Sequence, residues 1–213
     1  MKSAVKTVVI IETSMHSTQL PGKLMLRLGD KTVLGQILTR CFLIYGVDEI
    51  CCVIPDSSEH DILAEESNKY SAIIFRSKEK NALESYYKAA VFINADVIIR
   101  ITSNCPLINP AICSKVLNLH VKTNSQYTCN NMPPSWPYGY ECEVFGIEQL
   151  EKAYNNKNVI SSLEHLSDWM KANYNVVNFS NPDGNIHYKK VALDTPEDYV
   201  RIANFFNSNC YSV

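Results

Sequence analysis

Residues 5–23 read V-K-T-V-V-I-I-E-T-S-M-H-S-T-Q-L-P-G-K, an apolar run that passes at once into a polar loop. β-Branched residues favour extended backbone, and a short apolar run bounded by turn residues is typical of a buried strand. The sequence therefore predicts a strand from Val5 to Ile11. Ligands of open parallel sheets bind beyond the carboxyl ends of the strands, so the following loop, Glu12 to Lys23, is the first place to expect chemistry.

The rest of the chain alternates between short β-branched runs and segments in which apolar residues recur at helical spacing. Predicted strands cover residues 49–54, 72–75 and 96–102, and predicted helices cover 33–45, 58–68, a segment around 83–90 and a segment that Pro110 opens. Such alternation is typical of a mostly parallel sheet covered by helices. We therefore expect an α/β fold of three layers, α/β/α, around a central sheet.

The middle of the chain has a different character. Residues 126–146 hold three prolines and Gly139 between two extended runs, which indicates a loop-rich excursion beside the sheet. The remaining predicted elements are helices at 147–156 and 161–172, extended runs at 176–179 and 188–193, and a last helix started by Thr195 and Pro196. We expect a single domain, 1–213, in which residues 126–187 form an excursion that serves substrate binding or dimerisation.

The composition excludes several classes of protein. The 213 residues carry 20 basic and 22 acidic side chains, a net charge of −2, so no nucleic-acid or membrane partner is indicated. The first apolar stretch, Val8 to Ile11, is too short for a signal peptide or a membrane span, and we expect a cytoplasmic protein. The eight cysteines, two of them adjacent in an apolar run, fit buried reduced thiols better than disulfides or zinc ligands.

The loop from Glu12 to Lys23 combines small hydroxyl residues, a Pro-Gly turn and one lysine, as a phosphate-binding loop would. It lacks the glycines of G-x-x-x-x-G-K-[ST] and of G-x-G-x-x-G, which argues against an ordinary ATPase or NAD dehydrogenase. On these residues alone, a structural turn and a phosphate site are equally good interpretations.

Several motifs resemble those of the sugar cytidylyltransferases. The loop resembles the family's I-I-Q-A-R-M-x-S-T-R-L-P-G-K. Further similar motifs, in order along the chain, are G-V-D-E-I at 46–50, Y-Y-K-A-A at 86–90, R-I-T-S-N-C-P-L-I at 100–108, G-Y-E-C-E-V-F at 139–145, E-H at 164–165 and L-D-T-P-E-D at 193–198. The spore-coat polysaccharide branch is the most similar, and it is related to the acylneuraminate and keto-deoxyoctulosonate cytidylyltransferases. The resemblance covers nearly the whole chain and implies the fold of the nucleotide-diphospho-sugar transferases, a GT-A-like sheet.

The resemblance also implies a reaction, the transfer of CMP from CTP to a small sugar, with Mg²⁺ as cofactor and a homodimer as the assembly. A sugar hydroxyl would attack the α-phosphorus and pyrophosphate would leave, so cations are needed there. Carried over residue by residue, Lys23 is the catalytic phosphate cation, and Asn104 and Asp194 hold the metal. The expected nucleotide-binding residues are Glu12, Ser14, His16, Ser17, Thr18, Gln19, Arg76 and Arg100, and the expected sugar-binding residues are Glu141, Glu143 and His165.

Some of these residues have an equally ordinary structural interpretation. Arg76 and Arg100 lie at predicted strand ends, where ligand binding competes with an internal ion pair, and Glu143 has the same two interpretations. His165 is either a sugar contact or part of a helix face. His16 is either a proton-dependent cation near phosphate or a solvated loop residue.

Departures from the family pattern fall on charged positions. Ser14 and Gln19 stand where the family has arginines, and Asn104 stands where it has the first metal-binding aspartate. Asn104 can still bind a metal through its neutral oxygen, but more weakly. Two hypotheses follow. One is an active transferase that makes a donor for polysaccharide or glycoconjugate synthesis, and the other is a family member without catalysis that binds nucleotides or nucleotide-sugars as a regulator.

Overall fold

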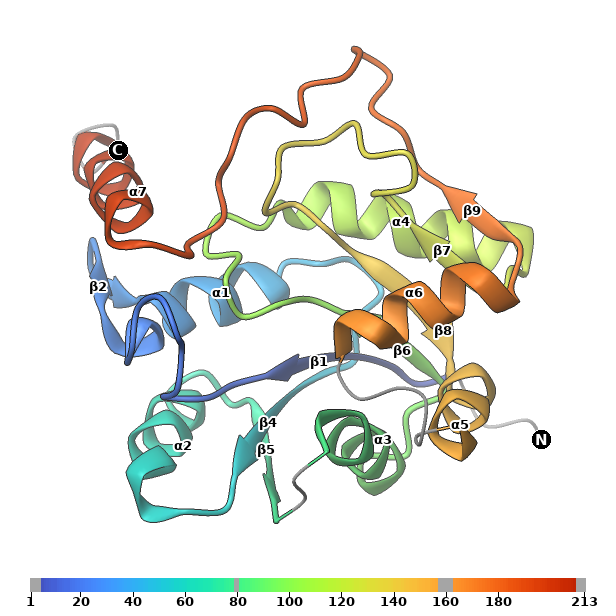
Figure 1. Cartoon of the computed structure of the whole chain (residues 1–213), viewed down its shortest axis with the longest axis horizontal. Helices are drawn as coiled ribbons and strands as arrows, with labels where there is room; N and C mark the ends of the chain where they lie inside the picture. The colour runs from blue at the N-terminus through green and yellow to red at the C-terminus, as the bar shows by residue number, and fades with distance from the viewer. Residues whose placement is uncertain (1–4, 79–80, 157–162, 210–213) are drawn as a thin grey trace.

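A seven-stranded sheet forms the middle layer of the protein (Figure 1). The computed structural model describes residues 5–78, 81–156 and 163–209. Within them the strand order is β5-β4-β1-β6-β8-β7-β9. The bounds are β1 Thr7–Glu12, β4 Glu49–Pro55, β5 Ile73–Ser77, β6 Val97–Arg100, β7 Tyr127–Cys129, β8 Glu143–Gly146 and β9 Val176–Asn178. β1 is parallel to β4 and β6, and β4 is parallel to β5, so the predicted α/β fold with a mostly parallel sheet is confirmed.

Helices cover both faces of the sheet because successive side chains of a strand point to opposite faces. Val9 and Ile11 of β1 pack in a cluster with helices α1, Val33–Cys41, and α4, Pro110–Thr123, to which α2, Asp61–Asn68, and α7, Pro196–Asn209, also contribute. Val8 and Ile10 pack in a second cluster with α3, Ala82–Phe92, α5, Ile147–Asn155, and α6, Leu163–Asn173. The remaining short elements are the 3₁₀ helices η1, Lys23–Met25, and η2, Ser58–His60, and the hairpin strands β2, Arg27–Leu28, and β3, Lys31–Thr32.

Two predicted elements end earlier than the sequence pattern suggests. The helix from Val33 ends at Cys41 rather than at Tyr45. Beyond Cys41 the backbone tightens into turns, in which Leu43 N–H donates to the Arg40 carbonyl and Ile44 N–H to the Cys41 carbonyl. These turns place Ile44 in the core and leave Tyr45 89% exposed. The strand predicted at 96–102 likewise ends at Arg100.

The prediction of an excursion beside the sheet is wrong in one respect, because both extended runs of residues 126–146 are strands of the main sheet. β8 lies between β6 and β7 and is antiparallel to both. The predicted extended run at 188–193 is not a strand. It is held mainly through Tyr138, whose N–H donates to the Lys189 carbonyl while its own carbonyl accepts from Val191 N–H.

The last helix begins as predicted, since Asp198 N–H donates to the Thr195 hydroxyl at 3.3 Å. The seven described cysteines are buried and free, and burial raises the pKa of Cys51 to about 12. No helix of the described part has the length and apolar content that crossing a bilayer requires.

One buried histidine gives the fold a testable pH dependence. His120 in α4 is 7% exposed, its Nδ1 lies 3.1 Å from the Thr128 hydroxyl, and burial lowers its pKa to about 4. An unfolded histidine titrates near a pKa of about 6.5, so below that pH the unfolded state binds more protons than the folded state. The stability that the neutral histidine provides is therefore complete above about pH 6.5 and is lost as the pH falls toward 4.

We expect this histidine to remove about 2 kcal/mol of unfolding free energy between about pH 7 and pH 4.5. In His120→Asn, which keeps an acceptor near Thr128, that part of the pH dependence should be absent. Urea unfolding at both pH values measures it as the difference between the two proteins. Parallel pH profiles for the two proteins would contradict the assignment.

Candidate functional site

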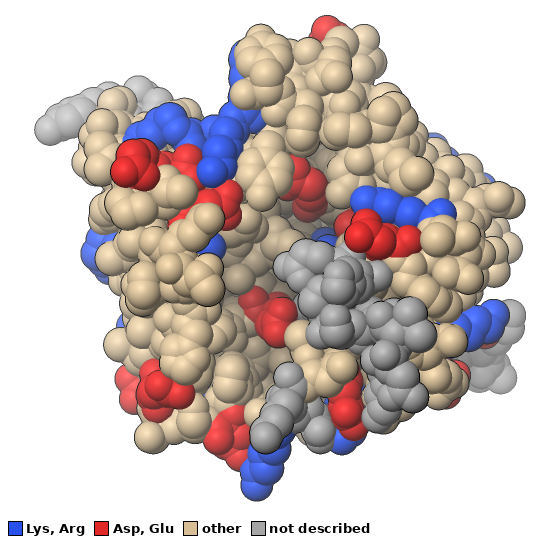
Figure 2. Space-filling model, in the orientation of Figure 1, with Lys and Arg blue, Asp and Glu red and all other residues tan. Residues whose placement is uncertain are grey.

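Two adjoining cavities open at the carboxyl end of β1. The larger, about 480 Å³, is lined by residues from β6, β8, α6 and the segments that follow β6 and β7, and the smaller, about 190 Å³, lies between the ends of β1, β4 and β5 and the start of α3. Glu12, the last residue of β1, lines both. Figure 2 shows a hollow on this face with acidic side chains within it. The predicted location of the site, beyond the strand ends, thus coincides with the cavities.

Lys23 borders the larger cavity from the loop that follows β1. Gly22 N–H donates to the Met15 carbonyl at 2.9 Å and closes this loop, and Gly22 has a φ of 69°, which favours glycine. The Lys23 ammonium donates to the Leu193 carbonyl at 3.0 Å. Burial lowers the pKa of Lys23, although the nearby Asp194 carboxylate opposes the shift. Lys23, the predicted phosphate-binding cation, and Asp194, a predicted metal ligand, therefore lie on the same side of the molecule.

Asp194 is held by two nitrogen donors. The Asn104 amide donates to its Oδ1 at 2.8 Å, and Lys190 Nζ lies 3.0 Å from its Oδ2. Lys190 also lies 2.5 Å from Asp198 Oδ2, and this hydrogen bond raises the pKa of Lys190. The structure thus brings the two predicted metal-binding residues, Asn104 and Asp194, together and adds a lysine that was not predicted.

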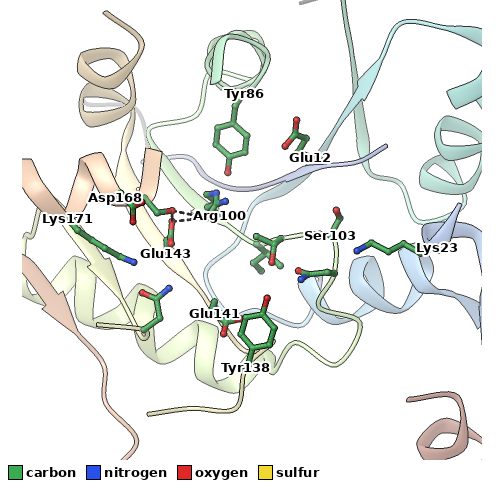
Figure 3. Close-up of a pocket in the computed structure, with 15 residues that line it drawn as sticks. Glu12, Lys23, Tyr86, Arg100, Ser103, Tyr138, Glu141, Glu143, Asp168 and Lys171 are labelled. Atoms are coloured by element: carbon green, nitrogen blue, oxygen red, sulfur yellow. Dashed lines mark hydrogen bonds and ion pairs between the residues drawn. The ribbon is translucent and has the colours of Figure 1, made fainter. Parts of the chain in front are cut away.

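Arg100 and Glu143 form a buried ion pair on the neighbouring strands β6 and β8. Arg100 Nη1 lies 3.1 Å from Glu143 Oε2, and the Ser167 hydroxyl donates to the same oxygen at 2.8 Å. Both charged side chains are at most 10% exposed. Burial is the largest single effect and lowers the pKa of Arg100, but the charge and hydrogen bond of Glu143 together with the nearby Tyr86 and Tyr127 outweigh it, and the pKa is raised. The pair lines the cavity (Figure 3), with each charge already matched by the other.

The other predicted nucleotide-binding residues are dispersed. Ser14 lines the smaller cavity, whereas Ser17, Thr18 and Gln19 line neither cavity. Arg76 donates to the Pro55 carbonyl at 3.0 Å and pairs with Asp61. This is the internal ion pair that the sequence allowed as an alternative to ligand binding. His16 is exposed and lies 3.1 Å from Glu59.

The predicted sugar-binding residues lie at the other side of the larger cavity. Glu141 lines it and accepts from Gly139 N–H at 2.8 Å, and burial raises the pKa of this carboxyl. His165 falls within α6, but its side chain lies outside the described residues. The functions of these side chains stay predictions.

Asp168, Lys171 and Asn131 are among the lining residues that were not predicted from the sequence. Asp168 and Lys171 come from α6, and Lys171 points into the cavity from the side opposite Lys23 (Figure 3). Asn131 follows β7, and its Oδ1 is buried with no hydrogen-bond partner in the described part of the chain. An i, i+3 pair of opposite charges on a helix looks like an ordinary surface pair in sequence, so no signal marked Asp168 and Lys171. The Asn-Asn-Met-Pro-Pro run at 130–134 was a usable signal for Asn131.

Comparison of the sequence with known proteins gives consistent matches. The sequence pattern of the family described as Cytidylyltransferase matches residues 8–195. The uncharacterized protein MJ1063 of Methanocaldococcus jannaschii is 30% identical over 171 residues, which are 80% of this chain and 69% of that protein. The spore coat polysaccharide biosynthesis protein SpsF of Bacillus subtilis is 26% identical over 207 residues, 91% of this chain and 83% of that protein.

Comparison of the fold with solved structures agrees with the sequence matches. A cytidylyltransferase from Leptospira borgpetersenii superposes with a TM-score of 0.84 at 23% identity, covering 97% of this chain and 96% of that one. A CMP:2-keto-3-deoxy-manno-octonic acid synthetase complexed with CTP gives a TM-score of 0.71 at 15% identity, covering 96% and 99%. At these identities the structural likeness supports the fold alone.

Proposed function

The chain belongs to the cytidylyltransferase family, and from this premise we propose that it transfers CMP from CTP to a small sugar. In this reaction a sugar hydroxyl attacks the α-phosphorus of CTP, a new phosphate ester bond forms, and pyrophosphate leaves. The product is an activated sugar, suited to polysaccharide or glycoconjugate synthesis. The work of such a site is to position the two reactants and to stabilise the negative charge of the leaving group.

The observation that carries the proposal is the position of Lys23. Its half-buried ammonium borders the larger cavity, next to Leu193 and Asp194, at the carboxyl edge of a parallel sheet. A cation withdrawn from bulk water interacts more strongly with a phosphate than an exposed one does. Lys23 would therefore bind the triphosphate and stabilise the charge that develops on pyrophosphate.

The two cavities suit the two substrates. The smaller one is bordered by hydroxyl groups of Ser14, Ser77 and Ser85, which can donate to or accept from the edge of a pyrimidine. The larger one offers the amide of Asn131, the carboxylate of Asp168 and the ammonium of Lys171, a mixture that suits sugar hydroxyls and an acidic group. Asn131 Oδ1 has no hydrogen-bond partner among the residues that the structure describes, and it would gain from a ligand because a buried acceptor without a partner is costly.

Asp194 can bind Mg²⁺ only after the side chains of Asn104 and Lys190, which now donate to it, turn away. A carboxylate and an amide oxygen are ligands that Mg²⁺ accepts, with phosphate oxygens completing the set. Here, however, Asn104 presents its NH₂ group to Asp194 and Lys190 covers the second carboxylate oxygen. Asn104 and Asp194 would hold the ion once these donors turn away, and Asp198 already offers Lys190 another partner. A bound divalent ion would neutralise charge on the phosphates.

Lys190 is therefore expected to compete with the metal ion for Asp194. In Lys190→Met this competition is absent, and the affinity of the protein for Mn²⁺, used as the probe ion together with CTP, should rise by about tenfold, the equivalent of about 1.4 kcal/mol. Titration followed by electron paramagnetic resonance of free Mn²⁺ measures the change. Lys189→Met, a change at the exposed neighbouring lysine, is the matched control. Weaker Mn²⁺ binding in Lys190→Met would show that Lys190 assists the ion.

The charge of the larger cavity favours a second candidate, a nucleotide-sugar binding or regulatory protein. Among the described residues, its lining includes four carboxylates, of Glu12, Glu141, Glu143 and Asp168, and three basic side chains, Lys23, Arg100 and Lys171. One of these, Arg100, is already paired with Glu143. A triphosphate would meet more negative charge here than a catalytic site for it normally presents.

The experiment that separates the two candidates is release of pyrophosphate from CTP with Mg²⁺ and a panel of keto-acid and hexose sugars. Release that depends on one sugar supports transfer. If no sugar elicits release, the variant Ser14→Arg, Gln19→Arg, Asn104→Asp restores the family's charges together, and release in this variant would assign the loss to those positions. Inactivity of both proteins, with CTP binding intact by calorimetry, would favour the regulatory candidate.

The assembly and location belong to the same proposal. We expect a homodimer that uses residues 126–187, and a protein of the cytoplasm. Sedimentation velocity of the full chain measures directly whether it forms a dimer.

A further inference from the structure

We propose that His16, Glu59 and His60 form a binding site for a divalent transition metal of the zinc class, outside the two cavities. This site is separate from the Mg²⁺ site considered above, and it does not depend on the proposed reaction. One ligand atom from each residue lies within 4.8 Å of the others. His16 Nε2 lies 3.1 Å from Glu59 Oε2, and His60 Nδ1 lies 3.7 Å from Glu59 Oε1.

The topology of the sheet brings these residues together. His16 lies in the loop after β1, and Glu59 and His60 belong to η2, which follows β4. β1 and β4 are parallel neighbours in register, Glu12 opposite Val53, so the segments that leave their carboxyl ends run side by side. The rings of His16 and His60 meet edge to face with centroids 5.1 Å apart. Three donors thus converge from two segments of chain that are more than 40 residues apart in sequence.

The type of ligand selects the class of metal. Two imidazoles and one carboxylate suit Zn²⁺, Co²⁺ or Ni²⁺, whereas Mg²⁺ and Ca²⁺ prefer oxygen ligands. Three protein ligands also leave room for water or an anion in a fourth position. The His16 and Glu59 side chains are 70% and 55% exposed, so an ion can enter from solvent. These two exposed side chains would have to move to bring all three donors to metal distance.

His60 has the surroundings of an oriented ligand. It is 2% exposed, its Nδ1 lies 2.9 Å from the Ser57 hydroxyl, and its Nε2 lies 3.2 Å from the Ser14 hydroxyl. One ring nitrogen would bind the ion after its serine hydroxyl turns away, and the hydrogen bond at the other nitrogen would keep the ring oriented.

The site adjoins the smaller cavity through Ser14, which contacts His60 and also lines that cavity. Lys23 is the one lysine in the loop of residues 12–23, which contains no arginine. A dication bound here would therefore place positive charge beside the cavity proposed for the nucleotide. This consequence, unlike the site itself, rests on the proposed function.

The test uses the full chain, freed of metals with a chelator, and Co²⁺ as the probe, in the absence of any nucleotide. We expect one Co²⁺ per chain with visible absorption bands of nitrogen and oxygen ligands, displaced by Zn²⁺ and unaffected by Mg²⁺. His16→Gln and Glu59→Gln should each weaken binding of Co²⁺ at least about tenfold. Both residues are exposed, so the folded state is expected to survive the changes.

His187→Gln and Glu65→Gln are the matched controls, since neither residue belongs to the cluster, and they should bind Co²⁺ as the unchanged protein does. Absence of Co²⁺ binding would overturn the proposal. So would binding that persists unchanged in His16→Gln and Glu59→Gln, because the ion would then be held elsewhere, for example by thiolates. Neither result bears on CTP-dependent activity, so this proposal and the proposed function fail separately.

Discussion

Replacing Lys23 by methionine is expected to lower kcat/KM for CTP by about 100-fold or more, the equivalent of about 3 kcal/mol of transition-state stabilisation. Methionine keeps most of the apolar stem and removes only the ammonium group. That group donates one hydrogen bond, to the Leu193 carbonyl at 3.0 Å, so the stability of the fold should change by only about 1 kcal/mol. The effect is therefore expected in catalysis, where the half-buried cation would face the leaving pyrophosphate of the proposed reaction.

The measurement is initial-rate release of pyrophosphate at several CTP concentrations, with unfolding by urea in parallel. Lys122→Met, at an exposed position near the end of α4, is the control for loss of one positive charge from the chain. A loss confined to KM would mean that Lys23 binds the ground state and the transition state equally. An unchanged kcat/KM in Lys23→Met would remove Lys23 from the site.

Replacing Arg100 by methionine is expected to lower the free energy of unfolding by about 3–5 kcal/mol, because a buried carboxylate then lacks its counter-charge. Glu143 is 3% exposed and its Oε2 has Arg100 Nη1 at 3.1 Å and the Ser167 hydroxyl at 2.8 Å. The serine alone cannot compensate a buried charge. Denaturant unfolding with the midpoint and slope compared between proteins measures the loss.

The double variant Arg100→Met, Glu143→Gln tests whether the loss comes from the unmatched charge. It removes both charges, and we expect it to be more stable than Arg100→Met alone, because a neutral amide is cheaper to bury than a carboxylate. Glu143→Gln by itself provides the fourth corner of the cycle. If the losses of unfolding free energy in Arg100→Met and Glu143→Gln add up to the loss in the double variant, the ion pair does not stabilise the fold and Arg100 is free to bind a ligand.

The layered fold was predictable because it depends on periodicity. Val8 to Ile11 of β1 bury all four side chains, and such a continuous apolar run is what a strand covered on both faces requires. The position of β8 was not predictable. Its four residues, Glu143–Gly146, begin with a buried carboxylate, and an antiparallel strand inserted between two others depends on contacts distant in sequence.

The candidate site was predictable where a motif carried it and unpredictable where packing did. The motifs brought Lys23, Asn104 and Asp194 to one edge of the sheet, as expected. They gave no indication that Lys190 would form an ion pair with Asp194. That pairing depends on Tyr138, whose backbone holds residues 189–191 in place. Arg76 shows the same limit, because a strand-end arginine looks alike in sequence whether it meets a ligand or, as here, Asp61.

The most direct test is a crystal structure of the chain with CTP and Mg²⁺. We expect the triphosphate within hydrogen-bond distance of Lys23 Nζ, released from the Leu193 carbonyl, with the cytosine in the smaller cavity beside Ser14. A nucleotide bound away from Lys23, with its ammonium still on the Leu193 carbonyl, would contradict the assignment of this edge of the sheet as a triphosphate site.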